Sequence, residues 1–284
     1  MKEHRARKRF GQNFLIDDTV VARIVAAINP QPGDHVVEIG PGFGALTEEL
    51  LMHVPTMDAL ELDRDLIPKL AQRCGNSSRK NIGKLTIHNA DALKFDFASL
   101  VVDHQPLRVV GNLPYNISTP LMFHLLNNKS VIKDMHFMLQ KEVVERLAAT
   151  PGNKDYGRLS VIMQYHCQVE FQFLVPPEAF SPAPKVESAI VRLVPYEQAP
   201  VKVDDVHVLE SVVTQAFSQR RKTLRNTLKK SLSAETLEAL GIDPVRRAET
   251  LSLEEFAAIA NYVANNGESN SESDALKNSQ GHGS

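Results

Sequence analysis

The stretch VVEIGPGFGALT, residues 36–47, joins a short apolar run to an amphipathic one through three glycines. The run HVVEI (35–39) predicts a buried strand, and ALTEELLMHV (45–54) predicts the helix that follows it. Glycines between a strand and a helix indicate a tight turn, and in some folds they let the backbone approach a bound nucleotide. The stretch therefore predicts the first strand–loop–helix unit of an α/β protein.

The same alternation continues along the chain. A helix over 20–28 precedes the stretch, strands are predicted over 57–62, 84–87, 107–110 and 135–139, and helices over 65–74, 120–128 and 141–149. Such a repeat favours a mostly parallel sheet covered by helices on both faces. After Tyr156, a helix over 159–165 leads to two strands, 168–175 and 188–194, which predict an antiparallel hairpin. From about Asp204 the pattern is wholly helical, with a capping box at Ser252–Glu255.

Composition limits the class of protein. The chain has 284 residues, 43% of them apolar, and a net charge of −2, with an acidic segment at the C-terminal end. No apolar run is long enough to cross a bilayer, and the basic N-terminus lacks the apolar stretch of a secretory signal. The two cysteines, Cys74 and Cys167, have neither disulfide nor metal spacing. We expect a soluble cytoplasmic protein without a metal.

The glycine loop has two functional interpretations beside that of a plain turn. A nicotinamide-binding fingerprint needs G-x-G-x-x-G, but here the third glycine comes one residue early, and Glu38 would repel a pyrophosphate. Two further acids lie at the ends of predicted strands: Glu61 is placed to bind a ribose diol, and Asp91 to accept from an adenine amine. Together these residues indicate a nucleoside with a cationic group, and S-adenosylmethionine is the common molecule of that kind.

The segment GNLPYN, residues 111–116, ends another predicted strand. Pro114 restricts Leu113 to an extended conformation and so gives its carbonyl a defined direction. The side-chain oxygen of Asn112 and this carbonyl can accept both hydrogens of one amine, while Tyr115 offers a ring for stacking. The group that fits is the exocyclic amine of adenine, which two neutral acceptors would prepare for attack on a sulfonium methyl. A simple strand-terminating turn is the alternative.

Phe180 lies in the proline-rich segment PPEAFSPAPK, residues 176–185. It either covers the second face of the adenine or anchors the loop in the core, and the sequence leaves both open. Stacking on one aromatic ring is worth ~1–3 kcal/mol per base.

Six segments carry a resemblance to a known family: RKRFGQNFL (7–15), VEIGPGFGALT (37–47), ELDRDL (61–66), NLPYNISTPLMFHLL (112–126), PPEAFSPAPKVESAIVRL (176–193) and QRRKTLRNTL (219–228). With them the chain resembles the ribosomal RNA adenine dimethyltransferases, most closely the bacterial small-subunit group associated with kasugamycin sensitivity. The resemblance covers nearly everything from Arg7 to about Ala264.

The resemblance implies a class I S-adenosylmethionine-dependent methyltransferase fold, Rossmann-like, with a mostly parallel seven-stranded sheet and a small all-α C-terminal domain. It implies a basic arm over 1–9, a catalytic domain over 10–200 and a helical domain over 201–264, and we expect a disordered acidic tail over 265–284. The reaction would be methylation of two adjacent adenosines in a hairpin near the 3′ end of small-subunit ribosomal RNA, in a pre-30S particle.

The resemblance also implies roles for residues. The cofactor would contact Asn13, Leu15, Gly40, Gly42, Glu61, Asp91 and Asn112. The adenine would be held by Asn112, Leu113, Pro114, Tyr115 and Phe180. The basic residues Arg7, Lys8, Arg9, Arg220, Arg221, Lys222 and Arg225 would neutralise RNA phosphates.

Two other functions remain open from the sequence. One is a large-subunit RNA methyltransferase of the macrolide-resistance type, which shares the catalytic segments. The other is an assembly factor that binds RNA without essential catalysis. QRRKTLRNTL and the stiff loop around Phe180 favour the small-subunit enzyme over the first, and intact Asn112, Tyr115 and Glu61 argue against the second.

Overall fold

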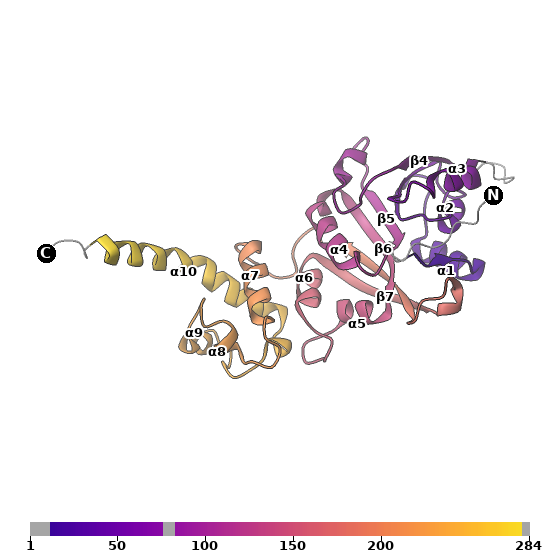
Figure 1. Cartoon of the computed structure of the whole chain (residues 1–284). Helices are drawn as coiled ribbons and strands as arrows, with labels where there is room; N and C mark the ends of the chain where they lie inside the picture. The colour runs from indigo at the N-terminus through magenta and orange to yellow at the C-terminus, as the bar shows by residue number, and fades with distance from the viewer. Residues whose placement is uncertain (1–11, 76–82, 280–284) are drawn as a thin grey trace. The chain divides into compact units, whose positions relative to one another are not determined.

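The computed structural model describes residues 12–75 and 83–279, with side chains as far as residue 266. These residues divide into two compact units (Figure 1). Unit 1 comprises residues 12–75, 83–144 and 167–195, and unit 2 comprises residues 145–166 and 196–279. No helix within the described ranges is both long and apolar enough to span a membrane.

A seven-stranded sheet forms the centre of unit 1, in the order β4-β3-β2-β5-β6-β9-β7. The strands are β2 (His35–Ile39), β3 (Thr56–Leu60), β4 (Lys84–His88), β5 (Leu107–Asn112), β6 (Ile132–Gln140), β7 (Cys167–Val175) and β9 (Ser188–Pro195). The first five strands of that order are parallel, whereas β9 is antiparallel to both β6 and β7. The predicted mostly parallel sheet with an appended hairpin is therefore confirmed.

Helices cover both faces of this sheet. On one side lie α1 (Asp18–Ile28), α2 (Ala45–Leu50) and α3 (Ile67–Gly75), and on the other lies α4 (Ser118–Asn127) (Figure 1). The predicted first helix is confirmed: Asp17 caps its N-terminus by accepting from Thr19 and Val20, and Asn29 ends it in a left-handed conformation. Its buried face packs in one core with Val36, Met57 and Val110 of the sheet. The pattern of apolar residues in each element thus determines which face it buries.

The order of the strands reverses between β2 and β5. The chain runs from β2 outward through β3 to β4, then returns to the other side of β2 with β5 and continues to β6. Ligands of open α/β sheets bind outside the carboxyl ends of the strands at such a reversal. The glycine loop after β2 and the segment GNLPYN at the end of β5 both lie at this point.

Unit 1 also contains a second, two-stranded sheet. In it β1 (Phe14–Leu15) pairs antiparallel with β8 (Phe180–Ser181), with Leu15 opposite Phe180. This pairing joins segments that lie about 165 residues apart in sequence, and no local pattern predicts it.

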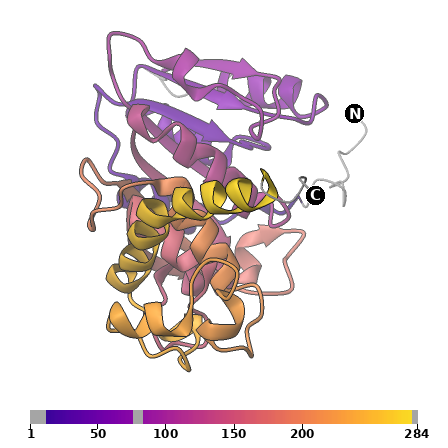
Figure 2. The ribbon, with the colours of Figure 1, turned by 90° about the vertical axis from the view of Figure 1, so that its left-hand side faces the viewer.

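Unit 2 is helical. It contains α6 (Arg158–His166), α7 (Val206–Ala216), α8 (Leu224–Thr227), α9 (Ala234–Ala239) and α10 (Leu253–Ser279), and α7 packs on α6 and on α10 (Figure 2). The helix α5 (Lys141–Ala148) spans the division between the units. The predicted capping box is present at the start of α10: Ser252 N donates to Glu255 Oε2 at 2.8 Å, and Glu255 N donates to Ser252 Oγ at 3.3 Å.

Two predicted boundaries differ from the structure. Residues 145–166, which the sequence assigns to the sheet domain, belong to unit 2, where Gly152 N donates to Glu249 O at 2.7 Å. The backbone of α10 also remains helical to Ser279, past the predicted start of a disordered tail at residue 265. Each added residue of an established helix needs only its own dihedral angles fixed, so a helix extends more easily than it starts.

Candidate functional site

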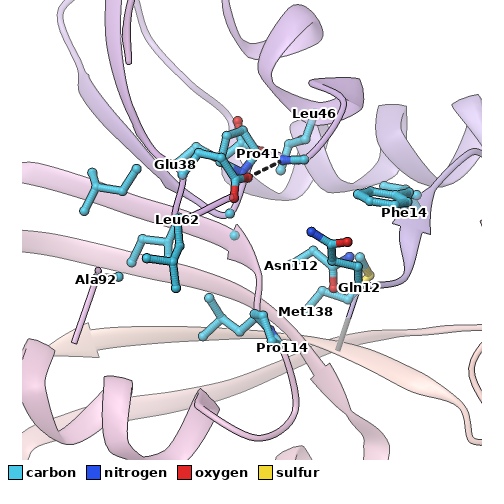
Figure 3. Close-up of a pocket in the computed structure, with 18 of the residues that line it drawn as sticks. Gln12, Phe14, Glu38, Pro41, Leu46, Leu62, Ala92, Asn112, Pro114 and Met138 are labelled. Carbon is cyan, nitrogen blue, oxygen red and sulfur yellow. Dashed lines mark hydrogen bonds between the residues drawn. The ribbon is translucent and has the colours of Figure 1, made fainter. Parts of the chain in front are cut away.

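A cavity of about 350 Å³ lies at the reversal of strand order in unit 1. Its walls come from the segment before α1, the loops after β2, β3 and β4, and the end of β5 (Figure 3). The predicted residues that line it are Asn13, Leu15, Gly40, Gly42, Glu61, Asp91, Asn112, Leu113, Pro114 and Tyr115. The volume lies in the range of small-molecule sites. The structure therefore brings together residues from five separate segments, although it does not test their individual roles.

The glycine loop leaves little space for side chains. Gly42 has a φ of +59°, and a Cβ there would lie 3.0 Å from the ring of Phe14. Phe14 packs on Phe43 with ring centroids 4.3 Å apart. The loop can therefore lie close under β1 only because residue 42 has no side chain.

Glu61 follows β3 directly, since the strand ends at Leu60 and not at Leu62 as the sequence predicts. Its side chain is 5% exposed. Asp63 N donates to Oε1 at 2.8 Å, and Gly42 N donates to Oε2 at 3.2 Å. Burial raises the pKa of this carboxyl, an effect that the two backbone donors oppose. The carboxylate is thus held in one orientation, and each oxygen keeps a lone pair for a ligand hydroxyl.

Asp91 lies in the turn after β4, where its Oδ1 accepts from Leu93 N at 3.0 Å. The side chain is half-buried at the cavity wall. One carboxylate oxygen thus closes the turn, and the group remains able to accept from a ligand amine.

Glu38, in β2, is a buried acid at the inner wall of the cavity. It is 2% exposed and accepts a hydrogen bond from the hydroxyl of Thr47. Burial, with a smaller contribution from the nearby Glu61, raises the pKa of Glu38 to about 7. The acid is thus partly protonated at neutral pH, and a cationic ligand group would favour its charged form.

This raised pKa predicts a pH dependence of stability. Between about pH 4.5 and pH 7 the folded chain keeps a proton on Glu38 that the unfolded chain releases. The contribution of Glu38 to the free energy of unfolding therefore falls as pH rises through this window, by roughly 3 kcal/mol at most. Glu38→Gln should remove the dependence, so it should be more stable than wild type at pH 8 and about equal to it at pH 4.5. Urea denaturation followed by circular dichroism at both values measures this, with the exposed Glu142→Gln, outside the cavity, as a control. A stability difference that does not change with pH would contradict it.

Asn112, the last residue of β5, has a defined amide orientation. Its Nδ2 donates to the backbone carbonyl of Asn13 at 2.9 Å. Because the amide nitrogen is directed to Asn13, the oxygen Oδ1 is directed away from it, and no residue in the described part of the chain donates to that oxygen. The bond thus presents a fixed acceptor at the cavity wall (Figure 3).

The next residues continue this wall. Leu113 N donates to Met138 O of β6 at 3.2 Å, and its side chain is 1% exposed. With Pro114 on the other side, the peptide that carries the Leu113 carbonyl has little freedom. The Tyr115 hydroxyl lies 3.2 Å from Ser188 Oγ of β9, so its half-buried ring is tethered to the hairpin.

Phe180 does not line the cavity. It is 3% exposed and packs in the core with Ile24, Val175 and Ile190. Of the two interpretations that the sequence leaves open, this placement corresponds to the loop anchor, because pairing of β8 with β1 turns the side chain inward. Stacking of Phe180 on a bound base stays a prediction.

Several residues that line the cavity are not among those predicted from the sequence. Phe14 and Gln12 come from the segment before α1, and Gln12 Nε2 donates to Asp63 Oδ2 at 3.1 Å. His136 and Met138 come from β6. For Gln12 and Phe14, the only indication in the sequence is the resemblance of residues 7–15. For the two residues of β6, the one local signal is a histidine inside an apolar strand.

The basic residues fall into two groups. Arg7, Lys8 and Arg9 lie outside the described residues. In unit 2, Arg221, Lys222 and Arg225 are exposed, as is Arg220, which donates to Lys154 O and lies 3.8 Å from the Glu249 carboxylate.

Backbone hydrogen bonds hold this second group in place. Leu224 N donates to Arg246 O at 2.8 Å, and Arg225 N donates to Pro244 O at 3.1 Å. The segment thus presents exposed cations on a well-anchored backbone.

A family model described as ribosomal RNA adenine dimethylase matches residues 3–265. The chain belongs to this family. Two of its relatives are the ribosomal RNA small subunit methyltransferase A of Pseudomonas aeruginosa, 60% identical over 92% of this chain and 96% of the relative, and that of Vibrio parahaemolyticus, 55% identical over 93% and 96%.

Solved structures agree with membership of this family. The chain is similar to a dimethyladenosine transferase from Plasmodium falciparum, with a TM-score of 0.75 and 26% identity over 89% of this chain and 98% of that one. It is also similar to the 23S rRNA methyltransferase ErmE, with a TM-score of 0.67 and 25% identity over 89% and 100%. The expected methyltransferase fold is thereby confirmed.

Proposed function

We propose that this protein transfers methyl groups from S-adenosylmethionine to the exocyclic amines of two adjacent adenosines near the 3′ end of small-subunit ribosomal RNA. The observation that carries the proposal is the amide of Asn112, whose nitrogen is bound to Asn13 and whose oxygen has no donor among the residues that the structure describes. The high identity to small-subunit methyltransferases supports the choice of substrate.

The residues of the cavity fit the cofactor. Glu61 is a buried, oriented carboxylate suited to a ribose diol, and Asp91 retains an acceptor for an adenine amine. Gly42 allows close approach of the backbone. Glu38 is an acid suited to a cationic ligand group. When bound, S-adenosylmethionine supplies an electrophilic methyl group on a sulfonium.

The other half of the site would act on the adenine. The amine is a poor nucleophile because its lone pair is delocalised into the ring. Acceptance of its two hydrogens by Asn112 Oδ1 and the Leu113 carbonyl turns the lone pair out of the ring plane, and Tyr115 stacks on the base. Both acceptors are neutral and held by the fold, so they act by position and preorganisation and not as strong bases.

The exposed cations of unit 2 would bind RNA phosphates. Arg221, Lys222 and Arg225 have the sequence-independent chemistry that such contacts need. The target base would be turned out of its stack to enter a cavity of this kind. The partner would be a pre-30S particle in the cytoplasm.

The substrate assignment is tested by methyl incorporation into purified subunits from a strain that lacks the modification. We expect label in the small subunit, in two neighbouring adenosines identified by mass spectrometry. The similarity to ErmE supports large-subunit RNA as the second candidate, and label confined to the large subunit would favour it. RNA binding without any label would favour an assembly factor.

Glu61→Ala tests whether cofactor binding and RNA binding use separate sites. The variant loses the carboxylate that would accept from two ribose hydroxyls, at about 1.5–3 kcal/mol for each charge-assisted bond. We expect affinity for S-adenosylhomocysteine, measured by calorimetry, to fall ~10²-fold or more, while RNA binding in a filter assay stays near wild type. Glu61→Gln, which keeps the shape, should give a smaller loss. Equal losses of RNA and cofactor affinity would contradict separate sites.

A further inference from the structure

His136 lies in the middle of β6 with its ring almost fully enclosed, since the residue is 3% exposed. Neither ring nitrogen has a hydrogen-bond partner among the residues that the structure describes. Buried polar groups are rarely left in this state, which costs about 1–3 kcal/mol for each group. A side chain that is kept here at such a cost is a candidate for binding a ligand.

The charged groups around His136 are engaged elsewhere. Asp134 Oδ1 is 3.9 Å from His136 Nδ1, too far for a hydrogen bond, and this carboxylate accepts from Arg108 at 2.9 and 2.8 Å. It also accepts from Arg192 at 3.4 Å. The Ala27 carbonyl of α1 is near enough to favour the protonated ring slightly, but it does not reach hydrogen-bond geometry.

The ring is neutral at physiological pH. Burial lowers the pKa of His136 to about 4, and the two arginines lower it further, against the opposing effect of Asp134. A neutral imidazole has one N–H donor and one nitrogen acceptor. It can therefore donate to an anionic group without adding a positive charge beside a sulfonium.

His136 also lines the cavity. It pairs with Val110 of β5, which pairs in turn with Glu38 of β2. Residues paired in this way project from the same face of a sheet. Glu38 and His136 thus project from the same face of the sheet, with Val110 of the intervening strand β5 between them, and both line the cavity.

The proposed function, on which this inference rests, leaves one part of the cofactor unplaced. Its ribose and adenine are assigned to Glu61 and Asp91, at the ends of β3 and β4, and its methyl to Asn112, at the end of β5. The third substituent of the sulfur is an amino-acid chain with an ammonium and a carboxylate. We propose that the N–H of His136 binds the carboxylate of this chain, in the part of the cavity that β6 lines.

The test compares two ligands that differ only in one substituent of the sulfur, which is the amino-acid chain in one ligand and a methyl group in the other. S-adenosylhomocysteine carries the amino-acid chain, whereas 5′-methylthioadenosine has the same nucleoside and sulfur without it. For His136→Leu we expect ~10-fold weaker binding of S-adenosylhomocysteine in calorimetry, as for the loss of one hydrogen bond to a charged group. Binding of 5′-methylthioadenosine should be unchanged.

Stability gives a second readout with the opposite sign. Removal of an unpartnered buried ring should leave the melting temperature of ligand-free His136→Leu equal to wild type or higher. His136→Gln, whose amide can still donate, should recover most of the affinity for S-adenosylhomocysteine and covers the case in which the leucine variant does not fold. Met135→Leu, whose side chain projects from the other face of β6, is the matched control.

Each outcome is decisive. Equal losses of affinity for the two ligands would make His136 a structural residue and overturn the inference. A loss of stability large enough to explain the weaker binding of both ligands would do the same. Unchanged binding of both ligands would overturn it as well. If wild type itself fails to bind S-adenosylhomocysteine, the proposed function fails first, and this result is distinct from a failure that concerns His136 alone.

Discussion

Asn112→Ala is expected to lower the rate of methyl transfer ~10²- to 10³-fold, the usual cost of removing one preorganised polar contact from a reacting group. The variant lacks the oxygen that would accept from the adenine amine, and it also lacks the bond to Asn13 that orients that oxygen. Cofactor affinity should fall by less than ~10-fold, because one hydrogen bond to a neutral group is worth about 0.5–1.5 kcal/mol. Single-turnover transfer to unmethylated small subunits measures the rate, and calorimetry measures the affinity.

Two further variants make this result specific. Asn112→Asp keeps an acceptor at the same place and should retain more of the rate than the alanine variant, even though its carboxylate faces the Asn13 carbonyl. Asn127→Ala, on the exposed end of α4, should behave as wild type. A normal single-turnover rate in Asn112→Ala, with only cofactor binding weakened, would remove Asn112 from the reacting centre.

Gly111→Ala is expected to destabilise unit 1 by about 3 kcal/mol or more, at or above the usual range for overpacking. A Cβ at this position would lie 2.6 Å from the backbone carbonyl oxygen of Ile39 and 3.2 Å from Leu113 Cδ2. Ile39 ends β2, whose position is set by pairing with both β3 and β5. Since the contacted atom belongs to a central strand and not to a flexible side chain, relief requires the two strands to separate.

Urea denaturation followed by circular dichroism measures this loss, since the chain has no tryptophan. Gly33→Ala is the matched control: a Cβ there meets no atom within 4 Å, and the free energy of unfolding should change by less than ~1 kcal/mol. Wild-type stability in Gly111→Ala, or equal losses in both variants, would show that close approach of β5 to β2 is not what requires the glycine.

This close approach also connects stability to the site. A Cβ on Gly40, after β2, would lie 3.9 Å from the backbone oxygen of Asn112. The same contact of strands that excludes a side chain at Gly111 therefore places the glycine loop beside the candidate acceptors. The rate of methyl transfer per folded molecule should accordingly be lower in Gly111→Ala than in wild type.

Much of the arrangement could be predicted from local pattern. The apolar runs of 35–39 and 107–110 fit strands buried on both faces, and the glycines of 40–44 fit a loop because glycine adopts positive φ angles without strain. The carboxyl ends of parallel strands lie at one edge of a sheet, so the sequence alone predicts that Glu61, Asp91 and Asn112 lie near one another. The capping box at Ser252 is also a local signal, since both of its hydrogen bonds lie within four residues.

Local pattern thus predicts the series of strands and helices and the edge of the sheet where the polar residues gather, and six motifs indicate the family. The packing of the elements was needed to show that Phe180 lies in the core, that Asn13 orients the amide of Asn112 and that residues 145–166 join the helical unit. It was also needed to show that the ring nitrogens of His136 have no hydrogen-bond partner among the described residues. The two kinds of feature differ in how far apart in the chain the interacting residues are. Secondary structure follows from periodicity over a few neighbouring residues, whereas these contacts join residues that are far apart in the chain and depend on how closely whole elements pack.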